Sequence, residues 1–348
     1  MSSEPIRALG LLSGGLDSIL ASRLLLEQGL QVEGVNFSTG FCIQAHTGSL
    51  RNPEEGVAPP RNDALHAARL LGIRLHLVDI AEDYVRIVTN PRHGYGKNLN
   101  PCLDCKIFMV QKAWEMAREM GFHFIFTGEV VGQRPMSQRR ANLPFIQKHS
   151  GAGEWLLRPL CAKRLLPTEP ELRGWVDREL LGALHGRGRY GQFEMARRFG
   201  ITDFPAPAGG CCFLTDPVYS RRLGDLWQGR GVRDYSMEDI LILKAGRHLR
   251  PAPHFKVIVG RDETENAFLE GFRNGRFALN ATEFPGPLAL VEGQPTEADL
   301  ELACRLTARF GKGKNEARVT VAIRGKEGET ERSVTPLLPE EIPEAWYI

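Results

Sequence analysis

The sequence predicts an α/β fold, with a parallel sheet in the first part of the chain and a smaller α+β domain after it. Short apolar runs typical of strands alternate with segments of helical spacing, and a Ser-Gly-Gly-Leu-Asp-Ser hexapeptide (13–18) stands between the first strand and the first helix. Strands that alternate with helices imply right-handed crossovers and a parallel sheet. With 348 residues, the chain exceeds one typical core, so we expect two domains.

The first half supplies the elements of the parallel sheet. Strands are predicted at 8–12, 31–37, 74–80 and 123–127, and helices at 16–27, 63–71, 82–88 and 106–120. Leu16, Ile19 and Leu20, for example, share one face of the first helix. Residues 40–60 and 90–101 are rich in Gly, Pro and Asn and are predicted to be loops.

Three polar segments follow predicted strands, at 13–18, 36–38 and 127–133. Ligands of parallel sheets bind at the carboxyl ends of the strands. We therefore expect these three segments to share one site.

The boundary between the two domains is predicted after a Pro- and Gly-rich segment, 204–217. The first domain is expected to span 1–217 and the second 218–348. In the second domain, a helix is predicted at 263–272, strands at 255–259, 288–291 and 317–323, and a further element at 239–243. The proline-spaced tail, 336–348, is expected to be extended.

Composition favours a cytoplasmic protein that does not bind a membrane. Hydrophobic residues make up 42% of the chain and the formal net charge is +2, yet no apolar run approaches the roughly 20 residues of a membrane span. The N-terminus lacks the basic and apolar regions of a secretory signal. In such a protein the seven cysteines are not expected to form disulfides.

The hexapeptide has the chemistry of a phosphate-binding loop. Gly14 and Gly15 let the backbone approach a phosphate, and the N–H groups at the start of the following helix favour an anion. The hydroxyls of Ser13 and Ser18 add hydrogen bonds, and Asp17 is a candidate ligand of Mg²⁺. No lysine is placed as in the G-x-x-x-x-G-K-[ST] loop.

With its strand–loop–helix setting, this hexapeptide resembles the PP-loop family of ATP pyrophosphatases. The resemblance implies that ATP is the cofactor and that the loop grips pyrophosphate while a substrate oxygen attacks the α-phosphate. The backbone at Asn36, Phe37 and Ser38 is then expected to bind adenine. Gly128 and Gln133 are expected to complete the nucleotide site.

A second motif covers residues 127–138, Thr-Gly-Glu-Val-Val-Gly-Gln-Arg-Pro-Met-Ser-Gln. It resembles the Gly-Glu-x-x-Gly-Gln-x-x-x-Ser-Gln segment of tRNA 4-thiouridine synthetases, and the Leu-Arg-Pro-Leu at 157–160 resembles another segment of that family. The likeness covers roughly residues 5–215 and implies tRNA as the partner. The N-terminal RNA-binding extension and the rhodanese-like domain of those enzymes are not evident. We therefore expect another part of the chain to bind tRNA and another donor, either sulfide or a cysteine desulfurase, to supply the sulfur. We also leave open whether the protein forms a homodimer.

Four cysteines suggest how sulfur is handled. Cys102 and Cys105 form a C-x-x-C motif, and Cys211 and Cys212 follow two glycines. Soft thiolates at this spacing suit iron–sulfur clusters or zinc. The arrangement resembles cluster-dependent tRNA thiolases, which implies a [4Fe–4S] cluster on Cys102, Cys105 and one of Cys211 and Cys212, with Cys211 preferred.

Two other interpretations of these cysteines stay open. The Asn-Pro-Cys start at residues 100–102 resembles tRNA 2-thiouridylases, in which one cysteine carries a persulfide and a distant one resolves it. A structural zinc site or simple packing is the other alternative. Cys42, Cys161 and Cys304 are isolated in the sequence and are predicted to be packing residues.

The second domain is a candidate tRNA-binding domain. Its segments 243–250, 255–262 and 265–266 resemble the RNA-binding domain that ends NFACT-type proteins. The residues suited to phosphate contacts are Lys244, Arg247, His248, Arg250, Lys256 and Arg261. Further basic clusters are Arg134, Arg139, Arg140 and Lys148; Arg187, Arg189, Arg197 and Arg198; and Arg221 and Arg222. An ordinary solvated basic face is the alternative for each.

Together, these features predict an enzyme that thiolates a uridine of tRNA. ATP adenylates the base carbonyl oxygen, and sulfur then displaces AMP, with Asp17, Cys102, Cys105 and Cys211 as catalytic residues. The 4-thio product is favoured over the 2-thio product. The alternatives are a PP-loop enzyme for a small molecule and a non-catalytic RNA-binding or sulfur-carrying protein.

Overall fold

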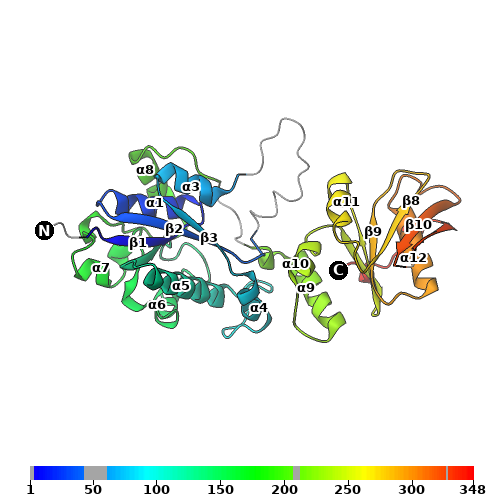
Figure 1. Cartoon of the computed structure of the whole chain (residues 1–348), viewed down its shortest axis with the longest axis horizontal. Helices are drawn as coiled ribbons and strands as arrows, with labels where there is room; N and C mark the ends of the chain where they lie inside the picture. The colour runs from blue at the N-terminus through cyan, green and yellow to red at the C-terminus, as the bar shows by residue number, and fades with distance from the viewer. Residues whose placement is uncertain (1–3, 43–60, 207–211, 327) are drawn as a thin grey trace. The chain divides into compact units, whose positions relative to one another are not determined.

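The computed structural model describes residues 4–42, 61–206, 212–326 and 328–348 (Figure 1). These residues form two compact units. The N-terminal unit contains the described residues up to Cys212, and the C-terminal unit begins at Phe213.

The N-terminal unit is built on a five-stranded parallel sheet, which confirms the predicted fold class. Its strands are β1 (Arg7–Leu11), β2 (Gln31–Ser38), β3 (Leu75–Asp79), β4 (Phe124–Thr127) and β5 (Leu156–Leu157). They lie in the order β3-β2-β1-β4-β5, so β1 is central.

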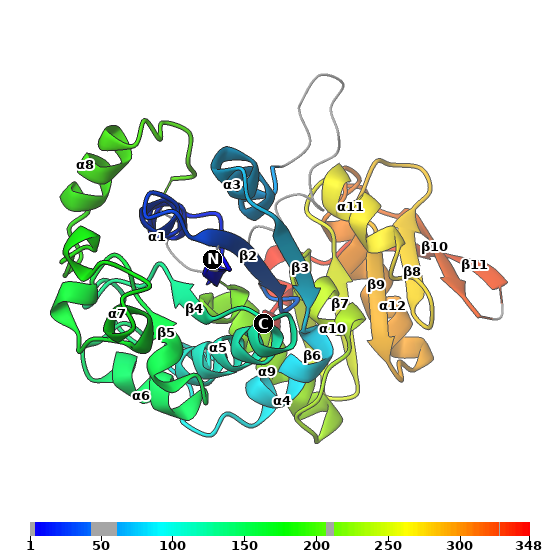
Figure 2. The ribbon, with the colours of Figure 1, turned by 60° about the vertical axis from the view of Figure 1, so that its left-hand side comes forward.

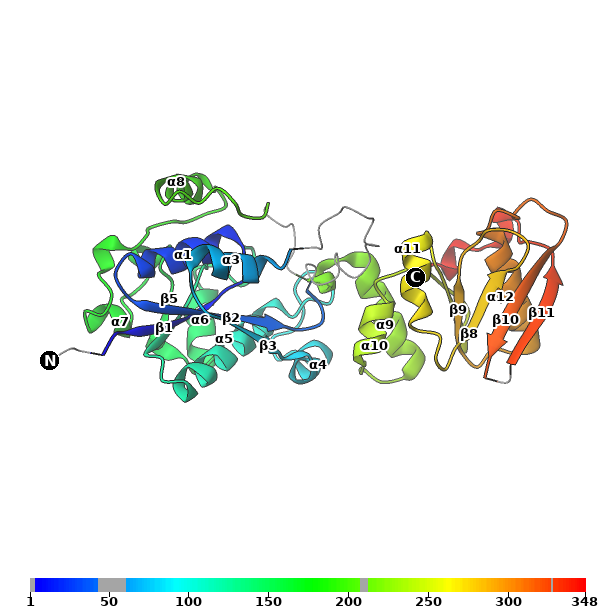
Figure 3. The ribbon, with the colours of Figure 1, turned by 45° about the horizontal axis from the view of Figure 1, so that its top comes forward.

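Helices cover both faces of this sheet (Figures 1 and 3). The helices of the unit are α1 (Leu16–Leu26), α3 (Asp63–Leu71), α4 (Ala81–Thr89), α5 (Cys102–Glu119), α6 (Asn142–His149), α7 (Glu169–Leu172) and α8 (Tyr190–Arg198). Short 3₁₀ turns are η1 (Gly153–Trp155), η2 (Ala162–Arg164) and η3 (Arg178–Leu180). Helices α1 and α3 pack on one face of the sheet around Ala8 and Phe126, and α5 packs on the other around Leu9 and Ile125.

Helix α5 begins earlier than the sequence pattern predicts. It starts at Cys102 rather than at 106, and the backbone N–H of Cys105 donates to the carbonyl of Pro101 at 2.8 Å. The prediction missed this turn because cysteine and aspartate are weak helix formers. Cys102 and Cys105 therefore both lie in the first turn of an 18-residue helix.

The C-terminal unit is built on a six-stranded antiparallel sheet in the order β11-β10-β8-β9-β7-β6. Its strands are β6 (Arg247–Ala252), β7 (Phe255–Val259), β8 (Phe277–Ala281), β9 (Ala289–Gly293), β10 (Val319–Gly325) and β11 (Gly328–Val334). Its helices are α9 (Pro217–Arg230), α10 (Met237–Ile242), α11 (Glu263–Glu270) and α12 (Glu297–Arg309), and its 3₁₀ turns are η4 (Phe213–Thr215), η5 (Pro339–Glu341) and η6 (Glu344–Trp346).

Alternation along β7 separates two cores in this unit. Val257 and Val259 face α12, which covers one side of the sheet (Figure 2). Ile258 belongs to the other core, together with Ile242 of α10 and Leu269 of α11. The unit is thus the predicted α+β domain, since its antiparallel sheet carries helices on both faces.

Several elements of the C-terminal unit differ from the prediction. Helices α9 and α12 and strands β6, β8 and β11 were not predicted. The tail is not simply extended, because it contains two 3₁₀ turns and Tyr347 pairs with Leu249. Within the described parts of the chain, no helix combines the length and the apolar character that crossing a bilayer requires.

Candidate active site

The topology of the parallel sheet fixes where a ligand can bind. From β1 the chain moves outward to β2 and β3, then returns to the other side of β1 as β4. The carboxyl ends of β1 and β4 therefore meet at a switch point, the place where open α/β sheets bind ligands. The segments after these two strands are the phosphate-loop hexapeptide and the motif at 127–138.

The hexapeptide forms a tight loop at the start of α1. Gly14 has a left-handed φ of 83°, and a Cβ there would lie 2.3 Å from the carbonyl carbon of Asp63, so only glycine fits. Gly15 is the N-cap of α1, and the Ser18 hydroxyl donates to its carbonyl at 2.8 Å. The Ser13 hydroxyl is 3.5 Å from that of Ser18. The loop thus presents hydroxyls and a helix N-terminus, as an anion site requires.

The second motif touches the loop through Gly128. A Cβ on Gly128 would lie 2.6 Å from the carbonyl carbon of Asp17 and from the backbone nitrogen of Ser18. Glycine therefore allows a backbone-to-backbone approach that any side chain would block. The two predicted motifs form one site.

Asp17 is the centre of a polar network in this site. Gln133 donates to its Oδ2 at 2.6 Å, and Gln192 in turn donates to Gln133 at 3.1 Å. A terminal nitrogen of Arg189 is 3.5 Å from Oδ1 of Asp17. That oxygen is buried and accepts no hydrogen bond from the described residues.

The environment of Asp17 fits a divalent cation. Mg²⁺ prefers carboxylate oxygens, and a buried carboxylate oxygen without a hydrogen-bond donor is available for such a bond. Arg189 places a positive charge beside the same oxygen, so Arg189 and the cation would have to share that oxygen. Asp17 would hold the ion next to phosphates at the loop, where the ion offsets their charge.

The predicted adenine-binding segment lies at the end of β2. The Asn36 side chain donates to the Leu12 carbonyl at 2.8 Å, which ties the start of the loop to β2. The Phe37 side chain is buried in the core beneath α5, so only its backbone faces a ligand. The Ser38 side chain is exposed, and its carbonyl accepts from Ile80 at 2.9 Å. Adenine binding here stays a prediction.

Glu129 and Arg158 connect the two segments that resemble the 4-thiouridine synthetases. Both are buried, and Arg158 Nε lies 3.1 Å from a Glu129 oxygen. Burial alone would raise the pKa of Glu129, but the charges of Lys106 and Arg158 together hold it below its ordinary value. The pair thus holds the loops after β4 and β5 together, and it contacts no open surface.

Lys106 extends this connection to α5. Its Nζ is 3.7 Å from Oε1 of Glu129, and it directly follows Cys105. Because crossover helices run antiparallel to the strands, the start of α5 lies at the carboxyl edge of the sheet. Asp104 accepts from the backbone of His93 at 2.9 Å and bonds its ring at 2.8 Å, which fixes the loop before the helix. Cys102 and Cys105 are both partly exposed in this first turn.

Cys212 lies near the start of the same helix. The Asn100 side chain donates to Sγ of Cys212 at 3.4 Å, and the backbone of Cys212 pairs with that of Cys42 in an antiparallel bridge. Cys42, predicted to be a packing residue, is thus partly exposed opposite Cys212. Cys211 lies outside the described residues. Among the residues that are described, no three His, Cys, Asp or Glu side chains form a group able to hold a metal ion.

The remaining two cysteines are buried. Cys161 donates to the Glu129 carbonyl at 3.2 Å, and burial raises its pKa to about 11. Burial raises the pKa of Cys304, beneath the sheet of the C-terminal unit, to about 12. Both thiols stay protonated near neutral pH and act as packing groups.

Most of the predicted phosphate-binding residues of the C-terminal unit have internal roles. Lys256 is only 2% exposed and lies 3.0 Å from Glu292. His248 is buried, and burial lowers its pKa well below the ordinary value. Lys244 is also buried. These three side chains are unavailable to RNA, which corrects the sequence-based assignment.

Two further cations of that set are paired with carboxylates. Arg250 makes a double contact with Asp225, and Arg261 makes one with Glu265. Arg222 of the basic clusters is likewise internal, since it donates to two backbone carbonyls, and burial lowers its pKa to about 10. Sequence pattern alone did not separate these cations from exposed ones.

A different group of cations is exposed on this unit. Lys312 and Lys314 project from the loop after α12, and no ion pair joins either to a described residue. Arg247 lies over the ring of Phe310 at 5.1 Å, next to this loop. A Cβ on Gly313 would be 2.7 Å from the Phe284 ring, so the glycine lets the loop lie close to the core. The signal in the sequence was the Gly-Lys-Gly-Lys-Asn run at 311–315, which the prediction passed over.

Comparison with known families agrees with the division of the chain into an N-terminal and a C-terminal unit. Residues 5–164 match the family model described as "Thiamine biosynthesis protein (ThiI)", and residues 246–347 match "NFACT protein RNA binding domain". The chain joins a ThiI-like PP-loop domain to an NFACT-type RNA-binding domain. Both resemblances inferred from the sequence are therefore confirmed.

The curated relatives of the PP-loop domain are distant. The chain is 25% identical to the tRNA-specific 2-thiouridylase MnmA of Thermobifida fusca, over 77% of this chain and 73% of that protein. It is 35% identical to MnmA of Mesoplasma florum, over 35% of each chain. Against MnmA of Pelobacter propionicus it is 32% identical, over 34% of this chain and 31% of that protein.

Solved structures give weaker likenesses. A 4-thiouridine synthetase–RNA complex with bound ATP aligns at 22% identity and a TM-score of 0.37, over 61% of this chain and 45% of that one. The C-terminal part of a fibronectin/fibrinogen-binding protein from Streptococcus suis aligns at 15% identity and a TM-score of 0.26, over 47% and 79%.

The PP-loop domain contains site residues that the sequence did not indicate. Arg189 and Gln192 reach the Asp17 network from more than 170 positions along the chain. Lys106 and Glu129 link the thiols to the loop. The sequence signals for these residues were the motif at 127–138, which contains Glu129, and the basic cluster that contains Arg189, for which both a phosphate contact and an ordinary solvated face stay open.

Proposed function

We propose that this protein thiolates a uridine of tRNA in an ATP-dependent reaction, with residues 1–217 as the thiolation domain and 218–348 as the RNA-binding domain. One observation carries the proposal: the phosphate loop and the two-cysteine start of α5 lie at one edge of the sheet, linked through Gly128, Glu129 and Lys106. An anion-binding loop beside a pair of thiols suits an enzyme that both adenylates and delivers sulfur.

In the first step, the carbonyl oxygen of the uridine attacks the α-phosphorus of ATP and pyrophosphate leaves. Ser13, Gly14, Gly15 and Ser18 bind the leaving pyrophosphate through hydroxyls and backbone N–H groups. Asp17 would hold Mg²⁺, which when bound would offset negative charge on the phosphates. Gln133 orients the Asp17 carboxylate by donating a hydrogen bond to it at 2.6 Å. The backbone of residues 36–38 contacts adenine.

In the second step, a sulfur nucleophile attacks the activated ring carbon and AMP leaves. Cys102, Cys105 and one of Cys211 and Cys212 handle the sulfur. Cys212 accepts a hydrogen bond from Asn100, two residues before Cys102. Cys102 and Cys105 both lie in the first turn of α5, and both are partly exposed to a sulfur donor.

Two chemistries for the sulfur remain within this proposal. A [4Fe–4S] cluster bound by three thiolates would leave one iron open to bind sulfide. Alternatively, a cysteine persulfide donates its outer sulfur, and a second cysteine then breaks the S–S bond. That route leaves a disulfide that a dithiol reductant must reopen.

The 4-thio product is proposed over the 2-thio product. The ThiI family match and the Gly-Glu-x-x-Gly-Gln segment at 128–133 support 4-thiouridine. The curated relatives, which are named 2-thiouridylases, keep the 2-thio product as the alternative. Lys312 and Lys314 are proposed as phosphate contacts on the RNA-binding domain because both are exposed, with the partly exposed Arg247 of β6 beside them.

The test uses the full chain prepared without oxygen. Unmodified tRNA is incubated with the protein, ATP, Mg²⁺ and sulfide, then digested, and nucleosides are identified by mass and chromatographic retention. We expect ATP-dependent 4-thiouridine. Cys102→Ser and Cys105→Ser should abolish it while ATP still binds, and Cys304→Ala, which removes a buried thiol, should retain it.

The outcomes separate the parts of the proposal. A 2-thio product would correct the position only. Full activity in both cysteine variants would remove the thiols from the mechanism. Absence of any thiolated nucleoside from protein that binds ATP and tRNA would refute the function.

A further inference from the structure

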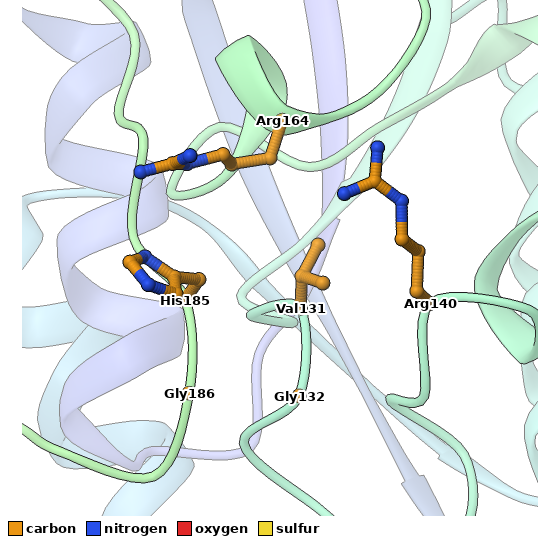
Figure 4. Close-up of a pocket in the computed structure, with 6 residues that line it drawn as sticks. All are labelled: Val131, Gly132, Arg140, Arg164, His185 and Gly186. Atoms are coloured by element: carbon orange, nitrogen blue, oxygen red, sulfur yellow. The ribbon is translucent and has the colours of Figure 1, made fainter.

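A basic cavity lies beside the active site of the PP-loop domain (Figure 4). Its volume is about 260 Å³, and its lining is Val131, Gly132, Arg140, Arg164, His185 and Gly186. The lining comes from three separate parts of the chain: the loop between β4 and α6, the turn η2, and the loop before α8.

The cavity has the charge of an anion site. Arg140 rises on one side of Val131, and Arg164 and His185 lie on the other, one above the other (Figure 4). No carboxylate lines the cavity. Arg164 Nε donates to the Ala183 carbonyl at 3.1 Å, which orients its guanidinium and leaves the two terminal nitrogens for a ligand. Among the described residues, no carboxylate forms an ion pair with Arg140, Arg164 or His185.

The cavity shares its walls with the active site. Val131 pairs with His185 in a parallel bridge, and Gly186 donates to the Val131 carbonyl at 2.7 Å. One residue after Gly132 is Gln133, and three residues after Gly186 is Arg189; both contact Asp17. A ligand in the cavity would therefore lie within a few residues of the adenylation site.

We propose that this cavity binds a backbone phosphate of tRNA close to the uridine that is modified. The inference rests on the proposed function. Small-molecule pockets typically measure about 300–1,000 Å³, so this smaller cavity suits a phosphate group better than a whole nucleotide. Two guanidinium groups suit a phosphodiester, because arginine can bind two of its oxygens at once.

An RNA phosphate is favoured over a phosphate of ATP as the ligand. The triphosphate already has a site at the loop of residues 13–18, where α1 begins. None of the cavity cations forms an ion pair or a side-chain hydrogen bond with that loop in the described structure. The cavity therefore adds a second anion site to the domain.

The test compares tRNA binding and ATP binding in the double variant Arg140→Gln/Arg164→Gln. Losing charge-assisted hydrogen bonds to one phosphate should weaken tRNA binding about tenfold. The slope of log Kd for tRNA against log salt should fall by about 1. The Kd for ATP should stay within twofold. In thiolation assays KM for tRNA should rise with little change in kcat.

The matched control is Arg69→Gln/Arg74→Gln, which removes two exposed charges from the same domain near the end of α3. Equal loss of tRNA affinity in both double variants would show that the effect depends only on the total charge of the domain, and it would overturn the proposal. A rise in the Kd for ATP alone would assign the cavity to the nucleotide. Unchanged tRNA binding and salt slope would also overturn it. If the variant loses its native circular dichroism, Arg140→Lys/Arg164→Lys keeps both charges but loses the two-oxygen contacts. It should therefore keep the wild-type salt slope with a weaker tRNA affinity, and wild-type affinity together with a lower slope would count against the proposal.

Failure of this inference can be distinguished from failure of the proposed function. Wild-type protein that thiolates tRNA, with a double variant that binds tRNA equally well, refutes only the cavity. Wild-type protein that neither binds nor thiolates tRNA refutes both.

Discussion

The cations of the two units differ in what they face. In the C-terminal unit, Lys256 lies against Glu292 and Arg250 against Asp225, so these charges are neutralised inside the protein. In the N-terminal unit, Arg140 and Arg164 line a cavity without a carboxylate. The side chains are of similar types, and the sequence predicted phosphate contacts for Lys256 and Arg250 but did not single out Arg164.

This difference shows that pairing and burial, rather than residue count, decide which cations can bind a nucleic acid. A buried, paired lysine serves the fold, and removing it leaves an uncompensated charge. An unpaired cation at the surface carries counterions that a phosphate can displace. The four changes below test that distinction, from the largest expected effect to the smallest.

Asp17→Asn should have the largest effect. The loss of the carboxylate charge removes the proposed ligand of Mg²⁺ and leaves Arg189 without its partner, so the ATP-dependent rate should fall about 1,000-fold. The rate of AMP formation in the presence of tRNA measures it. Glu194→Gln, an exposed charge change near Gln192, is the control and should leave the rate within twofold. Near-normal AMP formation by Asp17→Asn would remove this residue from the mechanism.

Lys256→Met should destabilise the C-terminal unit and leave RNA binding alone. The partly buried Glu292 would keep only Arg276 as a partner, so the free energy of unfolding in urea should fall by about 3 kcal/mol. The tRNA affinity of the folded variant should stay within twofold. Lys314→Met is the control for stability, and it should change the free energy of unfolding by less than about 0.5 kcal/mol. A large loss of tRNA affinity at Lys256→Met would reverse our interpretation of this region.

Glu129→Gln should destabilise the N-terminal unit by about 2 kcal/mol, because charged hydrogen bonds to Arg158 are weakened. The pKa of Glu129 is lowered in the folded state, so its contribution is present above the ordinary value of 4.5 and is lost as the pH falls further. Urea unfolding at several pH values should show the difference between wild type and variant shrinking below pH 4.5. Glu154→Gln, at an exposed site, should show no such trend.

Lys312→Gln/Lys314→Gln should give the smallest change. Removing two exposed cations should weaken tRNA binding about fivefold and lower the salt slope by about 1 to 2. Thermal unfolding should be unaffected. Arg250→Gln is an instructive contrast, because its paired charge should matter to stability rather than to the salt slope. An unchanged salt slope in the lysine variant would exclude this loop from the RNA contact.

The sequence predicted those parts of the molecule that depend on local pattern. The strand–loop–helix at residues 7–26 and the four long parallel strands follow from apolar periodicity and glycine placement. Helix α12 was missed although Thr296 and Asp299 form a capping box at its start, a local signal that we did not use. The start of α5 was misplaced because its first turn has weak helix formers.

The parts of the site that escaped prediction depend on long-range contact. Arg189 reaches Asp17, and Gln192 reaches Gln133 beside it, only after the chain has folded back over many residues, and nothing local marks that approach. The pairing of Lys256 with Glu292 is set by strand register between β7 and β9, which the sequence does not reveal alone. Cys42 opposite Cys212 is a third case, since an isolated bridge joins them.

The close approach at Gly128 has a consequence for the order of events. With no space for a side chain between Gly128 and the backbone of Asp17, a displacement of the phosphate loop would press directly on the 128–133 segment. That same segment forms a wall of the basic cavity through Val131 and Gly132. We therefore expect the departure of pyrophosphate from the loop to affect RNA bound at the proposed cavity site. The release of the two ligands should then be coupled in time.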